Sequence, residues 1–182
     1  MISGSDNPAA RFLERVLRSR RRGVPPGEYS PEAHGLLVEA EIPSAYEELD
    51  RYWVTEGLAL VVIARNRETN QAEYLLFEPV LSDFEYELLE RLFADLRDVL
   101  ILDDHDTASD RRAVLARKIQ DLLEEYGLAL PDASIFRIRY YLERNFLGWS
   151  RIDALMRDPG IEDISCDGTK IPLFLYHRKH QN

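Results

Sequence analysis

The spacing of hydrophobic residues in the middle of the chain predicts three long helices. Residues 82–100, 107–126 and 131–146 each carry apolar side chains three and four positions apart, the repeat of a helix with one buried face. The connections between these segments are short. The three helices are therefore expected to pack together as a bundle.

Residues at the ends of these segments support the prediction. Ser82 stands three positions before Glu85, and Thr107 stands three positions before Asp110, which is the spacing of a capping box. Gly127 follows the second segment, where a glycine can take the left-handed conformation that closes a helix.

Earlier in the chain, the hydrophobic pattern predicts a β-hairpin. Residues 58–64 form a strongly apolar strand, 65–71 a polar turn and 73–77 the returning strand. Glu78-Pro79 ends the hairpin, since proline cannot donate a ladder hydrogen bond. Because its first strand is so apolar, that strand is expected to be buried on at least one face.

Two segments before this hairpin are also assigned from their pattern. Residues 43–54 are predicted to be a helix, because three large side chains recur at helical spacing along one side, namely Tyr46, Leu49 and Trp53. Residues 36–38 are predicted to form a short strand.

The C-terminal residues predict a short helix followed by a second hairpin. Ser150 can cap this helix, and Pro159-Gly160 ends it. Residues 161–167 and 172–177 alternate as strands do, with a turn signal at Asp167-Gly168 between them. Three residues of the short helix are expected to share its apolar face: Ile152, Leu155 and Met156.

The last predicted strand has apolar residues on both faces. Its side chains alternate, with Leu173, Leu175 and His177 on one side and Phe174 and Tyr176 on the other. A lone two-stranded hairpin is marginally stable in water. This hairpin is therefore expected either to pack on the preceding helices or to belong to a sheet that this chain does not complete.

These assignments predict an α+β fold. It consists of a small β-hairpin and a helical bundle, followed by the first hairpin of a second, incomplete α/β domain. Residues 1–30 are expected to be a basic, flexible arm and linker, and residues 31–148 an N-terminal α+β domain. Residues 149–182 are expected to begin a further, truncated domain.

Composition narrows the class of protein. The chain has 182 residues, of which 45% are hydrophobic, enough for one core or for one domain and a fragment. No apolar run approaches the roughly eighteen residues of a membrane-spanning helix. A single cysteine, Cys166, fits a reducing, cytoplasmic setting.

The charge balance is strongly acidic. A formal charge of −10 argues against a surface that generally binds nucleic acid or coats a membrane. The basic residues are almost all arginines, since Lys118, Lys170 and Lys179 are the only lysines. Such an acidic, lysine-poor composition is typical of a high-salt, halophilic cytoplasm.

The N-terminal segment closes in a basic run, formed by Arg18, Arg20, Arg21 and Arg22. One interpretation is a contact for an anionic partner, such as acidic protein, lipid head groups or nucleic acid. The other interpretation is that these cations complement the dipole at a helix C-terminus and keep the arm soluble. We favour the second, because the rest of the chain is acidic.

The sequence contains none of the common catalytic or nucleotide-binding motifs. Gly-x-x-x-x-Gly-Lys-Ser/Thr and Gly-x-Gly-x-x-Gly, which hold nucleotide phosphates, are absent. Zinc-binding spacings and the Gly-x-Ser-x-Gly nucleophile elbow are absent as well.

Two weaker candidates for chemistry have simpler explanations. Residues 103–106 include His105 among aspartates, but adjacent loop residues rarely converge on one metal ion, so a solvated acidic loop is favoured. Cys166 and His177 could form a dyad, yet Cys166 is more simply a small apolar residue of a strand.

The C-terminal third carries a denser pattern of motifs. It begins with Tyr140-Tyr141-Leu142-x-Arg144-x-Phe146-x-Gly148, continues through Ile152-Asp153-x-Leu155-Met156-x-Asp158-Pro159-x-Ile161-Glu162-Asp163-Ile164-Ser165-Cys166-Asp167-Gly168, and ends in Tyr176-His177-Arg178-Lys179. This pattern resembles the archaeal type II/IV secretion-system ATPases, the cytoplasmic motors of archaeal pili, archaella and related secretion systems. Tyr52-Trp53-Val54 and Glu78-Pro79 are similar to the N-terminal domain of the same family.

The resemblance implies a longer protein. Family members carry an N-terminal domain, an intermediate nucleotide-contacting domain, which would begin near Ile161 here, and a RecA-like ATPase domain. They form hexameric rings beneath an integral-membrane platform protein. ATP and Mg are the implied cofactors of the full-length family. None is assigned to this chain, because the family's Walker motifs and catalytic residues would lie beyond Asn182.

Two functions are expected from the resemblance. The first is the N-terminal, non-catalytic portion of a pilus or secretion ATPase. It would position the hexameric motor against neighbouring subunits and the platform protein, at the inner face of the cell membrane. The second is a free-standing adaptor of the same system with no ATPase activity. Nucleic acid is not an expected partner. The candidate interaction residues are Arg18, Arg20, Arg21, Arg22, Asp163, Asp167, His177, Arg178 and Lys179.

Overall fold

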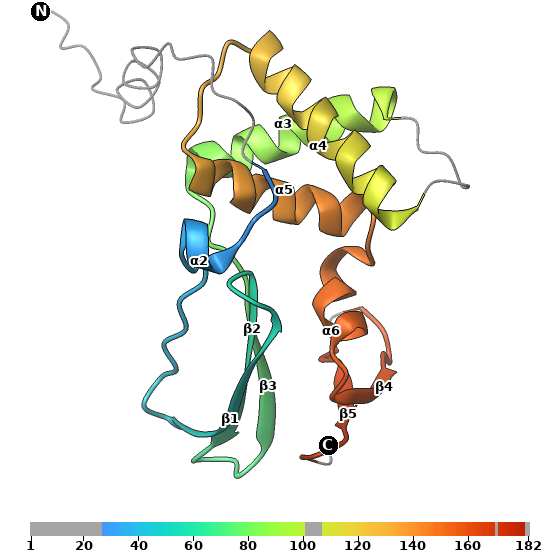
Figure 1. Ribbon diagram of the computed structural model, residues 1–182. Helices are drawn as coiled ribbons and strands as arrows, with labels where there is room; N and C mark the ends of the chain where they lie inside the picture. The colour runs from blue at the N-terminus through green and yellow to red at the C-terminus, as the bar shows by residue number, and fades with distance from the viewer. Residues whose placement is uncertain (1–26, 101–106, 170, 181–182) are drawn as a thin grey trace, which may run out of the picture. The chain divides into compact units, whose positions relative to one another are not determined.

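A computed structural model describes residues 27–100, 107–169 and 171–180 of the chain (Figure 1). It confirms a mixed α+β fold, with a three-stranded antiparallel sheet, three long helices and a two-stranded hairpin. The chain divides into two compact units. The helical unit comprises Met1–Tyr29 and Leu81–Leu147, and the sheet unit comprises Ser30–Val80 and Gly148–Asn182.

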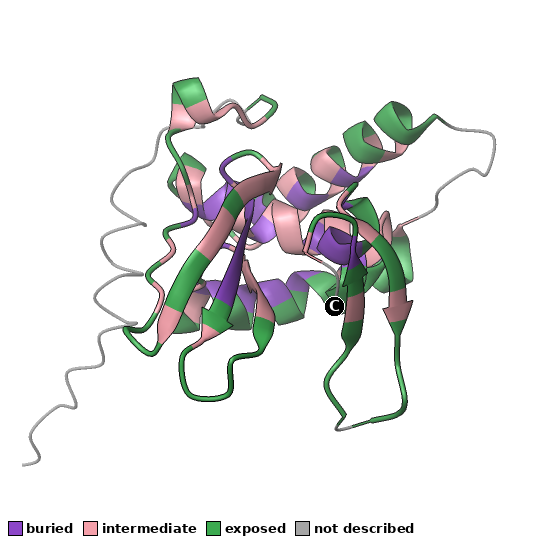
Figure 2. Cartoon of the chain, turned by 90° about the horizontal axis from the view of Figure 1, so that it is seen from below, coloured by how far each residue is buried: buried purple, intermediate pink, exposed green. Residues whose placement is uncertain are grey.

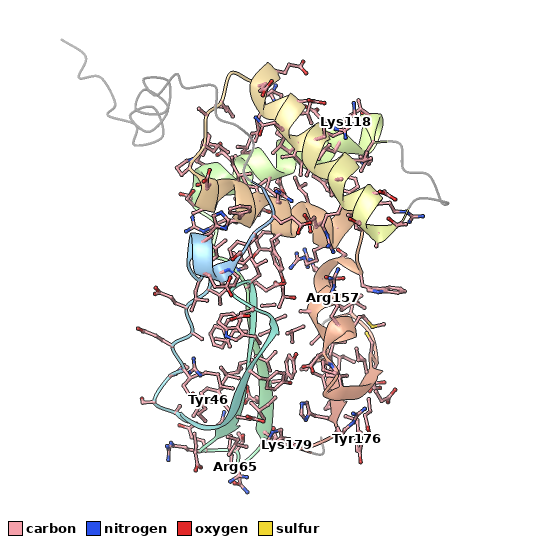
Figure 3. The ribbon with its side chains drawn as sticks, in the orientation of Figure 1. Tyr46, Arg65, Lys118, Arg157, Tyr176 and Lys179 are labelled. Carbon is pink, nitrogen blue, oxygen red and sulfur yellow. The ribbon has the colours of Figure 1, made fainter. Side chains whose placement is uncertain are left out.

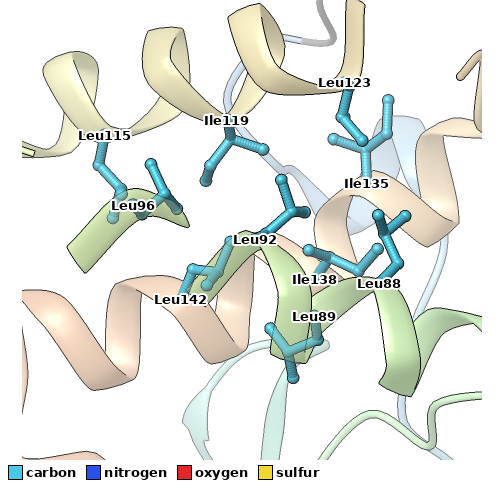
Figure 4. Close-up of a cluster of buried hydrophobic side chains, with 10 residues drawn as sticks. All are labelled: Leu88, Leu89, Leu92, Leu96, Leu115, Ile119, Leu123, Ile135, Ile138 and Leu142. Atoms are coloured by element: carbon cyan, nitrogen blue, oxygen red, sulfur yellow. The ribbon is translucent and has the colours of Figure 1, made fainter. Parts of the chain in front are cut away.

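The helical unit contains the three predicted helices. They are α3 (Asp83–Val99), α4 (Ala108–Glu125) and α5 (Asp132–Phe146). Each helix carries apolar residues at helical spacing along one face, and these three faces are buried against one another. Figure 4 shows the resulting cluster, which contains Leu88, Leu89, Leu92, Leu96, Leu115, Ile119, Leu123, Ile135, Ile138 and Leu142.

Both predicted capping boxes are confirmed. Ser82 caps α3 and Thr107 caps α4. In each box the cap side chain accepts the backbone N–H of the residue three positions on, whose own side chain accepts the backbone N–H of the cap. The backbone N–H of Ser82 donates to Glu85 Oε2 at 2.8 Å, and Arg137 contacts the other carboxylate oxygen at 3.1 Å. Burial opposes the ionisation of Glu85, but these hydrogen bonds and Arg137 hold its pKa below the usual value. The box therefore also ties the start of α3 to α5.

The sheet unit is organised around one central strand. The strands β1 (Tyr46–Thr55), β2 (Ala59–Asn66) and β3 (Ala72–Phe77) form an antiparallel sheet in that order. The first six residues of β2, from Ala59 to Ala64, are all buried, as Figure 2 shows. The predicted hairpin is thus correct, and its first strand is covered on both faces.

The prediction of a helix over residues 43–54 is wrong, because this segment is strand β1. The strand contains two register irregularities, between Glu48 and Asp50 and between Trp53 and Thr55. A bulge adds one residue to the two-residue alternation of a strand. Its large side chains therefore recur at intervals of three and four, which imitates a helix.

The short strand predicted at residues 36–38 is also not formed. Instead, a short helix, α2 (Pro31–His34), precedes an extended segment. The backbone N–H of Leu37 donates to Gly57 in the β1–β2 turn at 3.0 Å, and Val38 is buried. One hydrogen bond to a turn fixes the segment but does not make a ladder.

The C-terminal part of the sheet unit has the predicted helix–turn–hairpin order. A 3₁₀ turn, η1 (Ser150–Ile152), leads into α6 (Asp153–Arg157), followed by β4 (Ile161–Ser165) and β5 (Phe174–His177). Figure 2 shows that β4 and β5 are mostly exposed. The apolar face expected for the short helix is only partly correct: Leu155 is buried, whereas Ile152 and Met156 are exposed.

The compact units do not follow the order of the sequence. Residues 148–182, expected to begin a separate domain, are grouped with residues 30–80. Residues 81–147, which form the three long helices, lie between these two parts in the sequence. The division of a longer protein into domains at 1–30, 31–148 and 149–182 stays a prediction.

Candidate functional site

A cluster of polar side chains joins the C-terminal segment to the three-stranded sheet. Its centre is Asp158, which follows α6 and is only 4% exposed. The hydroxyls of Tyr52 on β1 and Tyr74 on β3 both donate to Asp158 Oδ2, at 2.6 and 2.8 Å. The backbone N–H of Gly160 donates to Oδ1 at 2.7 Å. The buried carboxylate is thus compensated by three donors.

His177 at the end of β5 extends the cluster. Its Nε2 lies 3.0 Å from the Tyr52 hydroxyl, and its Nδ1 accepts the backbone N–H of Lys179 at 3.2 Å. A backbone amide can only donate, so Nδ1 must be the unprotonated nitrogen. The neutral ring therefore carries its proton on Nε2 and donates it to Tyr52, which donates in turn to Asp158.

A second carboxylate binds the residues that follow β5. Asp50 on β1 accepts from Lys179 Nζ at 2.7 Å and lies 3.0 Å from His180 Nε2. These hydrogen bonds from Lys179 and His180 hold the pKa of Asp50 at about 2. The imidazoles of His177 and His180 are neighbours, with ring centroids 5.0 Å apart. Lys179 is labelled in Figure 3.

We refer to these seven residues as the sheet–hairpin cluster: Asp50, Tyr52, Tyr74, Asp158, His177, Lys179 and His180. Burial and the Asp158 carboxylate raise the pKa of both tyrosine hydroxyls well above the usual value. Both remain protonated donors at any ordinary pH. Burial, together with the nearby His180, lowers the pKa of His177 below 6.5, against the attraction of Asp158 and Asp50.

The turn between α6 and β4 allows these groups to approach closely. A Cβ atom added at Gly160 would overlap the imidazole of His177 and contact Asp158 Oδ1 at 3.0 Å. The carbonyl of Gly160 also accepts the backbone N–H of Arg178 at 2.8 Å. Glycine at this position therefore lets the turn and the end of β5 meet.

This arrangement holds segments of the sheet unit together, because its polar groups are directed at one another. Both oxygens of Asp158 and both ring nitrogens of His177 are engaged with other groups of the chain. The tyrosine hydroxyls are held in their protonated form.

The dyad of Cys166 and His177, the less favoured interpretation of these two residues, is not supported by these contacts. Cys166 is exposed in the loop after β4, where its sulfur lies 4.0 Å from the carbonyl oxygen of Gly168. The ring nitrogens of His177 instead contact Tyr52 and the Lys179 amide.

The candidate interaction residues of the hairpin differ in their exposure. Asp163 and Asp167 are exposed, and Arg178 is exposed and pairs with Glu162 at 2.9 Å. Lys179 is also exposed but extends to Asp50. His177 is buried, so its contacts are with this chain itself. The interaction role of all these residues stays a prediction.

Other candidates lie outside the described residues. These are the basic run Arg18, Arg20, Arg21 and Arg22, and the acidic loop 103–106 with His105. Within residues 27–100, 107–169 and 171–180, no group of three or more His, Cys, Asp or Glu side chains is arranged to hold a metal ion. None of the helices that the structure describes is long and apolar enough to cross a membrane.

Sequence reasoning missed the centre of the cluster. Tyr52 was hidden by the incorrect helix assignment, and a buried Tyr74 is not distinguished by the alternation of a strand. Asp158 carries a usable signal, because an aspartate before Pro159-Gly160 can accept a hydrogen bond from the turn backbone. That signal locates the turn but not the two distant tyrosines.

Comparisons with known proteins relate this architecture to pilus proteins. Residues 7–80 match the family model described as PilB3-like, N-terminal. The matched residues include β1, β2 and β3, and hence Tyr52 and Tyr74. The match supports similarity to the N-terminal region of a pilus or secretion ATPase.

A curated relative extends the similarity along the chain. The uncharacterized protein MJ1288 of Methanocaldococcus jannaschii is 31% identical over 146 residues. The aligned region covers 75% of this chain and 56% of the relative. The chain thus spans about half the length of that relative.

Proposed function

We propose that this chain is the N-terminal, non-catalytic region of a pilus-assembly or secretion ATPase. The observation that carries the proposal is the match of residues 7–80 to the PilB3-like N-terminal family. The absence of a phosphate-binding loop from the sequence agrees with a positioning role. ATP and Mg would then be bound by an ATPase region outside this sequence.

In this proposal the exposed hairpin provides a contact surface. Asp163 and Asp167 are exposed acidic residues on and after β4, and Tyr176 on β5 is 44% exposed (labelled in Figure 3). Arg178 and Lys179 pair with Glu162 and Asp50 of the chain itself, so Asp163 and Asp167 suit a partner surface that carries basic residues. The partners would be a neighbouring subunit of a hexameric ring and the cytoplasmic loops of the membrane platform protein. The basic run from Arg18 to Arg22 is a second candidate contact.

A free-standing adaptor of the same system is the second candidate function. It is favoured by the sheet–hairpin cluster, which ties the C-terminal hairpin to the chain's own sheet through Asp158 and Asp50. The two candidate functions make different predictions about the coding sequence that follows Asn182. The motor proposal requires an ATPase core encoded in the same reading frame after Asn182, and the adaptor does not.

Binding to the platform protein tests the proposal directly. The purified chain is mixed with the platform protein's cytoplasmic loops at low and high salt, and affinity is measured by biolayer interferometry. We expect the double variant Asp163→Lys, Asp167→Lys to weaken binding by roughly tenfold. In the proposal both aspartates face the partner, and the substitutions reverse their charge. Asp121→Lys, an exposed position on α4, is the matched control and should leave binding unchanged. Absence of binding by the unaltered chain at every salt concentration would refute the positioning role.

A further inference from the structure

The two outer strands of the three-stranded sheet differ in how their edges are protected. Strand β1 has two register irregularities and carries four charged residues, Glu47, Glu48, Asp50 and Arg51. Strand β3 pairs with β2 without an irregularity, and Glu73 is its only charged residue. Bulges and charges are common means by which an edge strand avoids pairing with another chain. The edge of β3 is therefore much less protected than the edge of β1.

The hydrogen bonds at the β2–β3 turn show which backbone groups of β3 face this edge. The backbone N–H of Asn66 donates to the carbonyl of Gln71 at 2.9 Å, so these two residues form a hydrogen-bonded pair. Such pairs alternate with non-hydrogen-bonded pairs along an antiparallel ladder. Every second residue of β3 is therefore bonded to β2, namely Glu73, Leu75 and Phe77. The residues between them direct their backbone N–H and C=O groups outward: Ala72, Tyr74 and Leu76.

These outward groups meet no other strand in the part of the chain that the structure describes. Within residues 27–100, 107–169 and 171–180, no backbone hydrogen bond from another segment reaches Ala72, Tyr74 or Leu76. The C-terminal segment does not take this place, because its hydrogen bonds to the sheet end on the side chains of Asp50, Tyr52 and Tyr74. It thus contacts a face of the sheet and adds no strand to β3.

The other described edges are less suited to receive a strand. Strand β5 has only four residues. Strand β4 is irregular between Ile161 and Asp163 and carries two adjacent acidic residues, Glu162 and Asp163. Strand β3, an outer strand in Figure 1, offers the longest regular edge. Its outward row of donors and acceptors is complementary to the backbone of another extended strand.

The order of residues in β3 allows the strand to pair with a copy of itself. In an antiparallel pair centred on Tyr74, every outward residue meets an outward residue of the second copy. Tyr74 then lies opposite Tyr74, and Ala72 lies opposite Leu76. Each of these pairs can exchange two backbone hydrogen bonds. Shifting the centre to any other residue engages fewer of the outward groups.

The one charge of β3 does not oppose this pairing. Glu73 Oε2 accepts from the Tyr46 hydroxyl at 3.0 Å, and Oε1 accepts from the Asn66 side-chain amide at 3.3 Å. Its carboxylate is therefore hydrogen-bonded within its own sheet. In the pair centred on Tyr74, Glu73 lies opposite Leu75 of the second copy, so like charges do not face each other.

We propose that the chain forms a dimer with a second copy of itself, in which the two β3 strands pair antiparallel about Tyr74 and join the two sheets into one. The assembly stops at two chains, because the joined sheet has β1 at both of its outer edges. The bulges and charges of β1 oppose the addition of a further strand. This inference does not rest on the proposed function, because neither the C-terminal hairpin nor the basic run takes part in the contact.

Salt distinguishes this dimer from binding to a basic partner. Two chains that each carry a formal charge of −10 repel each other, and salt screens that repulsion. The dimer should therefore become tighter as the salt concentration rises. Binding of the acidic hairpin to a basic partner surface should become weaker under the same change.

Sedimentation equilibrium on the full chain tests the dimer. We expect the mass to rise from one chain to two between about 10 and 500 µM, since the contact is well below the standard interface size. We expect the dissociation constant to fall about fivefold between about 0.1 and 1 M salt.

Two variants of Ala72 test whether the outward backbone groups form the contact. Ala72 is exposed at the start of β3, and its N–H is not bonded to β2, so proline is tolerated there. Ala72→Pro removes the donor that would reach the carbonyl of Leu76 in the second copy. Because the loss occurs twice in the dimer, we expect dimerisation to weaken about tenfold. Ala72→Ser keeps the N–H and is the matched control, which should dimerise like the unaltered chain.

Amide hydrogen exchange, measured by NMR on the unaltered chain, tests the register without a variant. Exchange at Tyr74 and Leu76 should slow roughly fivefold as the concentration passes through the dimerisation range. The amides of Glu73 and Leu75 are bonded to β2 and should be protected at every concentration. This alternation distinguishes pairing along β3 from any contact that merely covers the strand.

Several results would overturn the dimer. The chain may not remain monomeric up to about 500 µM at both salt concentrations, nor grow beyond two chains. Equal dimerisation of Ala72→Pro and Ala72→Ser would also exclude the β3 contact. If Ala72→Pro does not fold, the exchange of Tyr74 and Leu76 decides, and unchanged exchange there overturns the proposal. Platform binding by a monomeric chain would refute the dimer and leave the proposed function intact.

Discussion

The carboxylate of Asp158 receives three hydrogen bonds from three separate parts of the chain. Tyr52 and Tyr74 come from the two outer strands of the sheet, and the Gly160 amide comes from the adjacent turn. A buried, ionised group requires such compensation, because it loses its hydration on folding. Asp158 is therefore the residue at which the early and late parts of the sheet unit are tied together.

Asp158→Asn should destabilise the sheet unit by about 1–3 kcal/mol, because the NH₂ that replaces one carboxylate oxygen cannot accept a hydrogen bond. Whichever way the amide is oriented, its NH₂ meets either the tyrosine hydroxyls or the Gly160 amide. Urea unfolding followed by intrinsic fluorescence measures the change. Asp163→Asn is the matched control, since Asp163 is exposed on β4, and should change stability by less than about 0.5 kcal/mol. Equal effects of the two substitutions would contradict the assigned role of Asp158.

A second residue-scale prediction concerns acid stability. Asp50 has its pKa lowered from 3.8 to about 2 in the folded chain by Lys179 and His180. The unfolded chain therefore binds more protons between these values, and unfolding becomes easier as the pH falls. The stabilisation is fully present above the unfolded pKa and is lost as the pH falls through the folded pKa. Chemical unfolding across this range should show the slope in the unaltered chain and a reduced slope in Asp50→Asn.

At the scale of single elements, local sequence was sufficient where local hydrogen bonds decide the structure. The helices α3, α4 and α5 and both capping boxes were predicted, because a cap and an apolar repeat lie within a few residues of each other. The strand β1 was not, since its two bulges depend on pairing with β2. The cluster around Asp158 was missed for the same reason: Tyr52 is 106 positions away from it in sequence.

The two capping boxes should differ in their contribution to stability. Glu85 in the first box is buried and also contacts Arg137, whereas Asp110 in the second box is exposed. Removing a cap costs about 0.5–2 kcal/mol, and we expect Ser82→Ala to lie at the upper end of this range and Thr107→Ala at the lower end. Thermal unfolding of the two variants provides the comparison. A larger loss for Thr107→Ala would show that burial of Glu85 does not strengthen the first cap.

At the scale of the whole molecule, the sheet unit is assembled from two stretches separated by the helices. Residues 30–80 and 148–182 belong together, although 67 positions of the chain, residues 81–147, lie between them. The sequence predicted both hairpins, but hydrophobic periodicity carries no information about which distant segments pack together. The side chains of the sheet–hairpin cluster join these two stretches through contacts that periodicity does not reveal.

This discontinuous assembly has a consequence for synthesis on the ribosome. The strands β1, β2 and β3 emerge early, but Asp158 and His177 are translated only after all three long helices. During that interval the hydroxyls of Tyr52 and Tyr74 lack Asp158, the carboxylate to which they donate hydrogen bonds in the folded chain. Residues 158–180 therefore complete a structure that residues 46–77 began, and a ribosome stalled before residue 158 would hold a sheet without the contacts of Asp158 and His177.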